Sequence, residues 1–366
     1  MKKKVILFHL TPRMGMLHYA SQFANALSKK VDLQIVIASY YEDSLFDNPS
    51  IFYKIQTNPS FASFLYDSIL IWNHIKLMIF IIRNKPDIIH FIDNHPWYII
   101  YAPLFALFGK KIYVTQHDPT LHSGEVKTFQ GKIAAFTNKI LRNTADKVIV
   151  HGEHLKSELV ESYGISSNKI ISVPHGNFNF LAKDFLRKKI DTHNVIYTFL
   201  FFGRIIEYKG LDILLLAFKK INTSYSNVQL LVVGSGNLSP YNSYLNGVKN
   251  ITIVNESVPT EAIGEYFIQS DCVVLPYRDA TGSGIIPLAY AFEKPVIVTD
   301  VGEFSNIIKE SGGGICTAQN TVDGLTESMI YAIENKNNMI SFGKNGRKYT
   351  EEVLGWDTIV AKVYEI

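Results

Sequence analysis

Two cations five residues apart, Arg204 and Lys209, follow an apolar run that is typical of a buried strand, Tyr197–Phe202. Gly203 ends this run, and Gly210 begins a pattern of apolar residues at helical spacing. A guanidinium offers two parallel donors to a phosphate, an ammonium adds a compact charge, and helix N-terminal amides add partial positive charge. Because ligands of open α/β sheets bind beyond the carboxyl ends of strands, the pattern predicts a diphosphate site. The alternative is a pair of solvated surface cations.

A glycine also stands at the entry to the first predicted helix. Gly15 lies in the loop after the predicted strand Lys4–His9, where backbone amides can approach a phosphate or sugar closely. The fingerprint G-x-G-x-x-G is absent from this loop, which argues against a nicotinamide or flavin site. A glycine that only shapes the turn is the alternative. Met14 and His18, on either side of Gly15, are candidate residues for binding a second substrate.

Two histidines follow a later predicted strand, Lys111–Gln116. A lone histidine such as His117 is more often structural than functional. Asp118 beside it either orients the imidazole or caps the turn before the next proline. His122 could line an acceptor pocket or lie on a surface loop, and the residues alone leave both open.

Strand-like and helix-like segments alternate along the whole chain, as in parallel α/β proteins. At 366 residues the chain exceeds what one hydrophobic core usually supports. We therefore expect two doubly wound, Rossmann-like domains facing across a cleft, residues 1–178 with 346–366 and residues 179–345, around a polar linker at 177–194. The predicted strands are Lys4–His9, Leu33–Ala38, Asp87–Ile92, Lys111–Gln116, Lys147–His151 and Lys169–Val173, then Tyr197–Phe202, Gln229–Val233, Ile251–Val254, Cys272–Leu275, Pro295–Thr299 and Gly314–Cys316.

The composition is that of an ordered globular protein, with 47% hydrophobic residues, 19% charged residues and a net charge of +3. Nothing in it indicates a dedicated nucleic-acid binder, but a mildly basic protein suits anionic substrates or an anionic lipid surface. Cys272 and Cys316 both fall in strands predicted to be buried, and two such thiols build neither a disulfide framework nor a metal site. We expect neither a signal peptide nor a membrane-spanning segment, because the amino-terminal lysines lead directly into a short strand and no apolar run is long enough.

Large apolar side chains crowd the predicted helix Asn73–Arg83 and the residues before it, with Lys76 and Lys85 among them. This pattern fits either a basic amphipathic surface or an ordinary helix that covers a sheet. The second interpretation is favoured, because the helices of a Rossmann-like domain need apolar faces.

The order of motifs in the second half resembles that of the large group of retaining glycosyltransferases called family 4, which have the GT-B fold and include bacterial polysaccharide transferases. The resemblance implies an acceptor bound mainly by the first domain, a nucleotide-sugar bound by the second, and a final helix that crosses back to the first. The motifs that carry it are Gly203-Arg204 with Lys209-Gly210, Val233-Gly-Ser-Gly236, Ser270–Pro276, Lys294–Ile297, Val173-Pro-His-Gly176 and the late Trp356.

The resemblance also implies roles for single residues. Arg204 and Lys209 stabilise the diphosphate leaving group, whose charge grows in the transition state, so neither a metal nor another cofactor is expected. Gly15 lets the backbone reach the donor, and His117 touches the donor sugar as a catalytic residue. The remaining candidates for donor binding are Gly203, Val258, Gly282, Ser283, Gly284 and Ile285.

The sequence departs from the family at its best-known signature, two glutamates separated by seven residues. Counting back from Lys294 puts these positions at Ala280 and Leu288, and a shift by one residue gives Thr281 and Ala289. Their loss puts sugar identity and ribose recognition in doubt. A missing hydrogen bond to a charged partner costs about 1.5–3 kcal/mol, so affinity can fall without abolishing the chemistry.

These observations predict a retaining, metal-independent glycosyltransferase. It would move a hexose-type sugar from a nucleotide-diphosphate sugar to a glycan or a polyprenyl-diphosphate-linked glycan, in bacterial surface polysaccharide synthesis. We expect a cytoplasmic protein with no nucleic-acid partner and with peripheral contact to the anionic inner membrane. The alternatives are a catalytically inactive nucleotide-sugar-binding homologue and another GT-B enzyme, such as a nucleotide-sugar epimerase.

Overall fold

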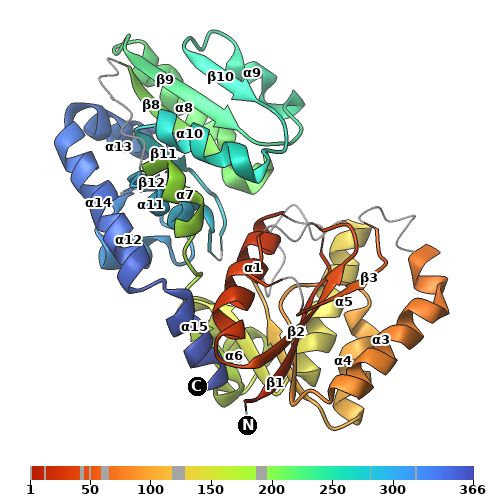
Figure 1. Ribbon diagram of the computed structural model, residues 1–366. Helices are drawn as coiled ribbons and strands as arrows, with labels where there is room; N and C mark the ends of the chain where they lie inside the picture. Colours follow the sequence, from red (N-terminus) through yellow and green to blue (C-terminus); the bar gives the residue numbers. More distant parts are fainter. Residues whose placement is uncertain are drawn as a thin grey trace. The chain divides into compact units, whose positions relative to one another are not determined.

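The computed structural model describes residues 2–11, 14–41, 45–48, 51–58, 66–117, 128–186, 196–280, 282–317 and 320–366. They form two compact units (Figure 1). The second unit is Asn177–Gly355, and the described residues up to Gly176 together with Trp356–Ile366 form the first. The sequence-based division lies after residues 178 and 345, whereas the structure divides the chain after Gly176 and Gly355.

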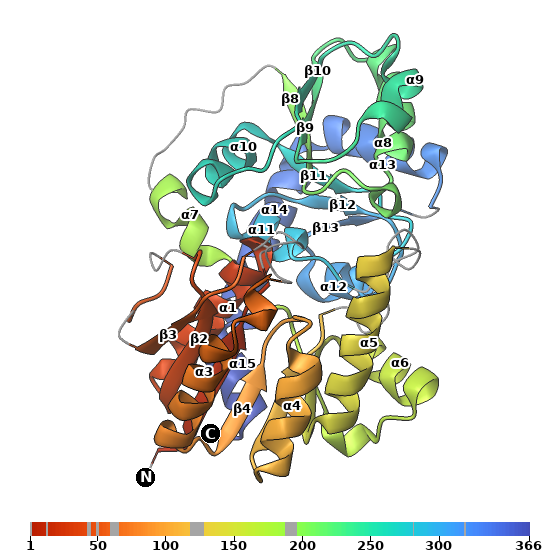
Figure 2. The same ribbon diagram turned by 90° about the vertical axis from the view of Figure 1, so that its right-hand side faces the viewer.

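Seven parallel strands form the sheet of the first unit, in the order β3-β2-β1-β4-β5-β6-β7. Helices α1 and α15 lie on one face of this sheet, and α3, α4 and α5 lie on the other (Figures 1 and 2). The strands are β1 Lys4–His9, β2 Asp32–Ala38, β3 Phe52–Ile55, β4 Ile88–Phe91, β5 Lys111–Thr115, β6 Lys147–His151 and β7 Ile170–Val173. The helices are α1 Met14–Ser28, α3 Ile71–Asn84, α4 Tyr98–Leu107, α5 Phe129–Thr144, α6 Glu153–Tyr163 and α15 Trp356–Tyr364.

Six parallel strands form the sheet of the second unit, in the order β10-β9-β8-β11-β12-β13. The strands are β8 Tyr197–Phe202, β9 Val228–Val233, β10 Ile251–Val254, β11 Cys272–Leu275, β12 Val296–Val298 and β13 Gly314–Cys316. The helices are α7 Asn179–Leu186, α8 Leu211–Asn222, α9 Asn242–Leu245, α10 Ile263–Gln269, α11 Ile285–Ala291, α12 Phe304–Ser311, α13 Val322–Glu334 and α14 Lys336–Glu352. Two parallel α/β units confirm the predicted fold class.

Each sheet reverses the direction of strand addition once. The reversal falls between β1 and β4 in the first sheet and between β8 and β11 in the second. Open α/β sheets bind ligands at such a reversal, outside the carboxyl ends of the strands. The topology therefore directs attention to the loops that follow these four strands.

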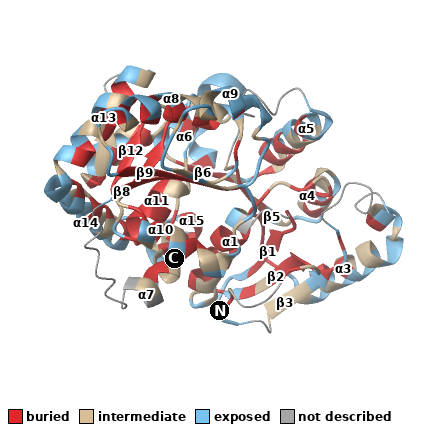
Figure 3. Cartoon of the chain, turned by 90° about the horizontal axis from the view of Figure 1, so that it is seen from above, coloured by how far each residue is buried: buried red, intermediate tan, exposed pale blue. Residues whose placement is uncertain are grey.

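The strands are apolar because both faces of a parallel sheet are buried. β1 buries every residue after Lys4, and β8 leaves only Phe202 half-buried. Figure 3 shows the buried residues gathered in the strands and on one side of the helices. Among the described residues, no helix combines the length and the apolar character needed to cross a membrane.

The structure corrects the sequence prediction at three places. β3 was missed, because a four-residue edge strand that buries only Ile55 carries little pattern. The predicted linker contains α7, whose Ala182 is buried in the core of the second unit and whose Phe185 packs against Gly264. Cys316 is half-buried instead of buried, because β13 is the last strand of its sheet.

The final helix, α15, completes the first unit, as predicted. The ring of Trp356 lies 5.0 Å from that of Tyr19 in α1, centroid to centroid. It also covers Gly176, where a Cβ would approach the indole to 2.2 Å. At the other end of α15, the Tyr364 hydroxyl is hydrogen-bonded to His90 Nδ1 at 2.7 Å. The last eleven residues thus pack as part of the first core.

Replacing Trp356 with alanine should destabilise the first unit by about 3–5 kcal/mol, since it removes a large buried ring between α1 and α15. Urea unfolding followed by circular dichroism measures the effect as a lower midpoint. The matched control is Ile340→Ala on α14, a side chain that is 56% exposed, and its effect should stay within about 0.5 kcal/mol. An unchanged midpoint for Trp356→Ala would contradict the role given to α15.

Candidate functional site

The candidate donor site of the second unit begins where β8 ends. Gly203 has a φ of 117°, and its amide donates to the Val233 carbonyl at 2.9 Å. A Cβ at position 203 would lie 2.8 Å from Lys209 Nζ and 3.9 Å from a methyl carbon of Ile285. Glycine is favoured here because residues with a side chain rarely adopt this φ, and a Cβ would also move the ammonium. Three predicted donor-binding residues therefore meet at one point.

Lys209 reaches this point from a short 3-10 turn, Glu207–Lys209, directly before α8. Gly210 permits the turn, because its φ is 67° and a Cβ there would lie 1.9 Å from the Pro276 carbonyl oxygen. The turn is thus pressed against the chain that leaves β11. Lys209 is only 8% exposed. Its Nζ donates to the Tyr277 hydroxyl at 2.8 Å and lies 4.8 Å from the centroid of that ring.

Burial controls the protonation of this pair. It lowers the pKa of Lys209 to about 8, with the charge of Tyr208 opposing the shift and that of Arg204 adding to it. Burial also raises the pKa of Tyr277 to about 12. At neutral pH the pair is therefore an ammonium that donates to a neutral phenol. A buried cation in a fixed position suits the recognition of an anion.

Ser283 extends this group of polar atoms toward α11. Its Oγ lies 3.5 Å from the Tyr277 hydroxyl and accepts a hydrogen bond from the Ile285 amide at 3.2 Å. Gly284 directly precedes α11. The first amide of α11, the helix predicted to bind the donor, is therefore already hydrogen-bonded to the hydroxyl of Ser283.

Two further predicted donor residues of this unit, Val258 and Gly282, are less closely tied to Lys209. Val258 lies half-buried in the loop after β10 and packs against the same apolar cluster as Tyr277 and Ile285. Gly282 is exposed, and a Cβ there would meet no atom of the described chain within 4 Å. Packing among the described residues therefore gives no reason for glycine at position 282.

The two arginines near the site differ in their surroundings. Arg278 forms a two-pronged ion pair with Asp212 of α8 and donates to the Glu207 carbonyl at 3.0 Å. This ion pair fixes the loop after β11 to α8. Arg204 is exposed, and its charge lowers the pKa of both Lys209 and Tyr277. Arg204 and Lys209 together form the positive end of the site.

In the first unit the predicted residues lie near the carboxyl ends of β1 and β5. Gly15 is the exposed second residue of α1, and a Cβ there would meet no atom within 4 Å in the part of the chain that the structure describes. Met14 begins α1, and His18 is buried one turn further on. His117 is half-buried just after β5. Asp118, His122 and Thr281 lie outside the described residues.

His117 belongs to an aromatic cluster. Its Nε2 lies 3.0 Å from the Ile92 carbonyl oxygen, and its Nδ1 lies 3.2 Å from His151 Nε2. Because a carbonyl only accepts, Nε2 of His117 carries a proton, and its Nδ1 pairs with the imidazole of His151. The ring of Tyr19 packs edge-on against both imidazoles, with centroids 4.7 and 5.1 Å away. To bind a sugar hydroxyl, a nitrogen of His117 would have to exchange one of these partners.

Burial favours the neutral form of His151 in this cluster. It lowers the pKa of His151 well below the ordinary value, with the charges of His117 and His175 adding to the shift. Within the described residues, no set of three or more histidine, cysteine, aspartate or glutamate side chains is arranged to hold a metal ion.

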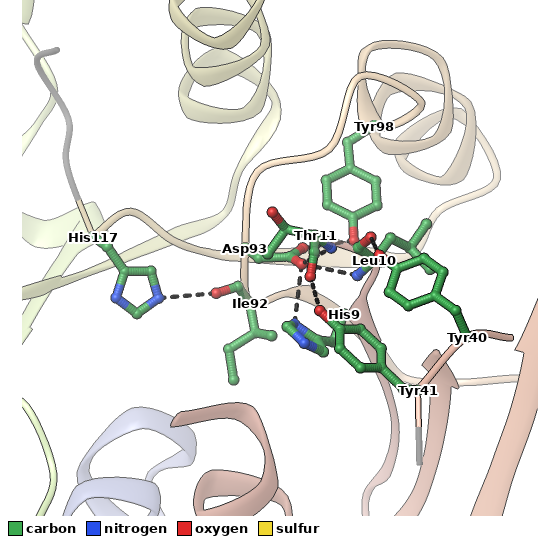
Figure 4. A network of polar contacts seen from close by, with 9 residues as sticks. All are labelled: His9, Leu10, Thr11, Tyr40, Tyr41, Ile92, Asp93, Tyr98 and His117. Carbon is green, nitrogen blue, oxygen red and sulfur yellow. Dashed lines mark hydrogen bonds and ion pairs between the residues drawn. The ribbon is translucent and has the colours of Figure 1, made fainter. Parts of the chain in front are cut away.

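A buried carboxylate lies at the strand reversal of the first sheet (Figure 4). Asp93, two residues after β4, accepts hydrogen bonds from the amides of Leu10 and Thr11 at 2.8 and 2.7 Å. It also accepts one from the Tyr98 hydroxyl at 2.7 Å and pairs with His9 Nδ1 at 3.0 Å. Asp93 thereby holds the start of the loop that leads from β1 into α1.

Two tyrosines complete this network. The Tyr40 hydroxyl donates to the Leu10 carbonyl at 2.8 Å, and the Tyr41 hydroxyl donates to the Thr11 carbonyl. Burial by itself would raise the pKa of Asp93, but the hydrogen bond and charge of His9, followed by the bonds from Tyr98 and Thr11, lower it. Sequence reasoning missed this network, because only the pairing of β1 with β4 brings Asp93 beside the loop.

Comparison with known proteins agrees with this arrangement. Residues 14–176 match the family model described as Glycosyltransferase Family 4, and residues 182–349 match the one described as Glycosyl transferases group 1. The chain belongs to these glycosyltransferases. Their two models divide the chain where the structure divides it, between an amino-terminal and a carboxyl-terminal α/β unit.

Curated relatives support the assignment. An uncharacterized glycosyltransferase of Methanocaldococcus jannaschii, MJ1178, is 26% identical over 274 residues, which are 71% of each chain. The capsular polysaccharide biosynthesis glycosyltransferase CapM of Staphylococcus aureus is 26% identical over 239 residues, 62% of each chain. Among solved structures, Anabaena Alr3699/HepE in complex with UDP-glucose has a TM-score of 0.71 at 14% identity and covers 99% of each chain. The glycosyltransferase thus has the GT-B fold.

The positions to which the resemblance assigns two glutamates are part of the core in this glycosyltransferase. Ala280 and Leu288 are only 5% and 6% exposed, and both belong to the apolar cluster that surrounds Tyr277. A carboxylate at either place would need a partner to offset its burial. Near Lys209 this segment instead contributes the hydroxyl of Tyr277, with that of Ser283 beside it.

Binding of nucleoside diphosphates should weaken as the pH rises through about 8, because Lys209, whose pKa burial lowers to about 8, loses its charge there. Tyr277→Phe removes the acceptor that stabilises the ammonium. It should therefore move the midpoint of this profile to lower pH. The affinity at neutral pH should fall for the same reason, because less of Lys209 then carries its charge. Calorimetric titrations across neutral and alkaline pH measure both effects.

Tyr331→Phe on α13 is the matched control, because its exposed hydroxyl contacts only Asn338 among the bonds described for it. Its titration profile should coincide with that of the native protein. A Tyr277→Phe profile with the native midpoint would show that the phenol does not set the charge of Lys209.

Proposed function

We propose that this glycosyltransferase moves a hexose-type sugar, with retention of the anomeric configuration, from a nucleotide-diphosphate sugar to a glycan or a polyprenyl-diphosphate-linked glycan. The diphosphate of the donor binds at the strand reversal of the second sheet, beside Gly203, Arg204 and Lys209. The observation that carries the proposal is the buried ammonium of Lys209, held on Tyr277 and 8% exposed.

The chemistry requires positive charge at this point. When the bond between the anomeric carbon and the β-phosphate oxygen breaks, the leaving nucleoside diphosphate gains negative charge. Cations that are already in place stabilise that charge more in the transition state than in the ground state. In this scheme Arg204 and Lys209 do what a divalent cation does elsewhere, so neither a metal nor another cofactor takes part.

The remaining site residues have supporting roles in the proposal. Ser283 and the amides around Gly284 bind phosphate oxygens, with Gly282, Val258 and Ile285 shaping the pocket. Gly15 offers its backbone to a phosphate or sugar, which the open space beside it supports. His117 acts through its fixed orientation on Ile92 and His151. Met14, His18 and His122 are assigned to the acceptor.

The biological setting we propose is bacterial surface polysaccharide synthesis in the cytoplasm, in peripheral contact with the anionic inner face of the membrane. The printed name of the relative CapM, a capsular polysaccharide biosynthesis glycosyltransferase, supports this setting. The UDP-glucose named with the HepE structure supports a nucleotide-sugar donor. A thermal-shift screen of UDP, GDP, dTDP and CMP and their sugar conjugates identifies the donor, since a ligand that binds only the folded state raises Tm.

Arg204→Ala and Lys209→Ala should each lower turnover by roughly two to three orders of magnitude, as for other lost transition-state donors. Single-turnover assays with the donor found in the screen separate this loss from weaker binding. The control Lys219→Ala removes an exposed cation of α8 that donates to the Asn246 carbonyl. Its turnover should be native, and native turnover in both site variants would remove the proposed role in leaving-group stabilisation.

Transfer should persist in excess EDTA, because two protein cations offset the charge of the leaving group. The measurement is the initial rate before and after chelation, with added magnesium as a second arm. A rate that disappears with EDTA and returns with magnesium would contradict the metal-independent scheme. The identity of the protein as a glycosyltransferase would stand.

A further inference from the structure

Helix α3 of the first unit has much apolar surface that the described residues leave uncovered. Only Leu77 and Ile81 are buried, so the helix meets its own unit through a narrow stripe. Trp72 is 70% and Ile82 is 67% exposed. The large apolar side chains exposed on α3 and just before it are Ile69, Ile71, Trp72, Ile75, Ile79 and Ile82. Positions 71, 75, 79 and 82 fall on one side of a helix.

Cations border this stripe. Lys76 and Arg83 are exposed and seven residues apart, which places them on the same side of α3, and the exposed Lys85 follows the helix. Lys76 and Arg83 also line an open groove of about 380 Å³ beside Tyr53 and Phe80, whose rings stack with centroids 4.4 Å apart. The sequence of α3 contains no acidic residue. Covering the sheet therefore accounts for the buried residues of α3 but not for its exposed apolar side chains.

The neighbouring helix α4 also exposes large apolar side chains. α3 and α4 lie side by side (Figure 2), and His74 of α3 is hydrogen-bonded to Tyr101 of α4. Ile100 and Leu107 of α4 are also exposed, as is Phe108, the residue that follows the helix. Large apolar side chains exposed together with cations are typical of an interaction site on a protein surface.

We propose that this surface, the α3 face, binds an anionic lipid bilayer, with α3 lying in the plane of the interface. The apolar stripe enters the boundary between head groups and acyl chains, where an indole such as that of Trp72 is favoured. Lys76, Arg83 and Lys85 meet the lipid phosphates. The α3 face supplies the contact surface for the membrane setting proposed above, and its binding does not require donor chemistry.

Charge complementarity favours the bilayer over a second copy of the chain. A two-fold contact would set the same patch against itself. Lys76 and Arg83 would then face like charges, because α3 offers no carboxylate in return. A bilayer that contains anionic lipids supplies the missing negative charge along the whole helix.

Vesicle co-sedimentation with the full chain tests the proposal. We expect binding to vesicles of phosphatidylglycerol and phosphatidylethanolamine that weakens as salt is added, and much weaker binding to phosphatidylcholine alone. Lys76→Gln with Arg83→Gln should lower the affinity for the anionic vesicles roughly 30-fold, since each cation near such a surface contributes about fivefold. Trp72→Ser with Ile79→Ser should lower it by at least about tenfold.

The matched control is Ile340→Ser with Lys344→Gln on α14, which makes the same kinds of change at two exposed positions and should bind like the native chain. Circular dichroism and Tm verify that the α3 variants are folded. Three results would overturn the proposal: native binding by both α3 variants, no binding of the native chain to anionic vesicles, or a dimer that the α3 substitutions dissociate. Nucleotide affinity measured on the same samples separates the two proposals, because it should stay native in the α3 variants.

Discussion

A buried ammonium held by a phenol is the interaction on which the candidate donor site depends. The ammonium of Lys209 lies beside Gly203 and is shielded from water. Its hydrogen bond to Tyr277 offsets part of the free-energy cost of this desolvation. Burial lowers its pKa to about 8, so the charge survives at neutral pH. Electrostatic attraction is stronger where the surroundings are less polarisable than water. A cation that is already desolvated and oriented therefore meets a phosphate without having to reorganise.

The first unit uses the opposite charge at the corresponding place in its sheet. Asp93 lies at the reversal between β1 and β4 and binds the amides of Leu10 and Thr11. His9 pairs with it and lowers the pKa of its carboxyl. This carboxylate positions a loop and lies too deep to meet solvent. A buried charge at each reversal thus stabilises the loop that leaves the sheet, and in the second unit we propose that this charge also attracts an anion.

The α3 face and the donor site use different physical properties of the chain. The donor site depends on a few polar atoms at fixed distances, because a shift of an ångström changes electrostatic stabilisation strongly. The α3 face depends on the sum of several exposed apolar side chains and cations, none of which needs an exact position. Substitutions in one should therefore leave the other unchanged. The two proposals can be examined separately in one protein.

The sequence by itself determined the alternation of strands and helices, the two-domain organisation and the glycosyltransferase motifs around Gly203 and Lys209. It could do so because apolar periodicity and the spacing of glycines and cations are properties of residues that are close in the sequence. Only the tertiary structure decided which groups surround Lys209. Tyr277 lies 68 residues further along the chain, and the pairing of β8 with β11 brings it within reach. The same holds for Asp93 beside Leu10, and for the exposed stripe of α3, since periodicity predicts an apolar side of a helix without stating what covers it. Strand order and packing are long-range properties, so local patterns could not supply them.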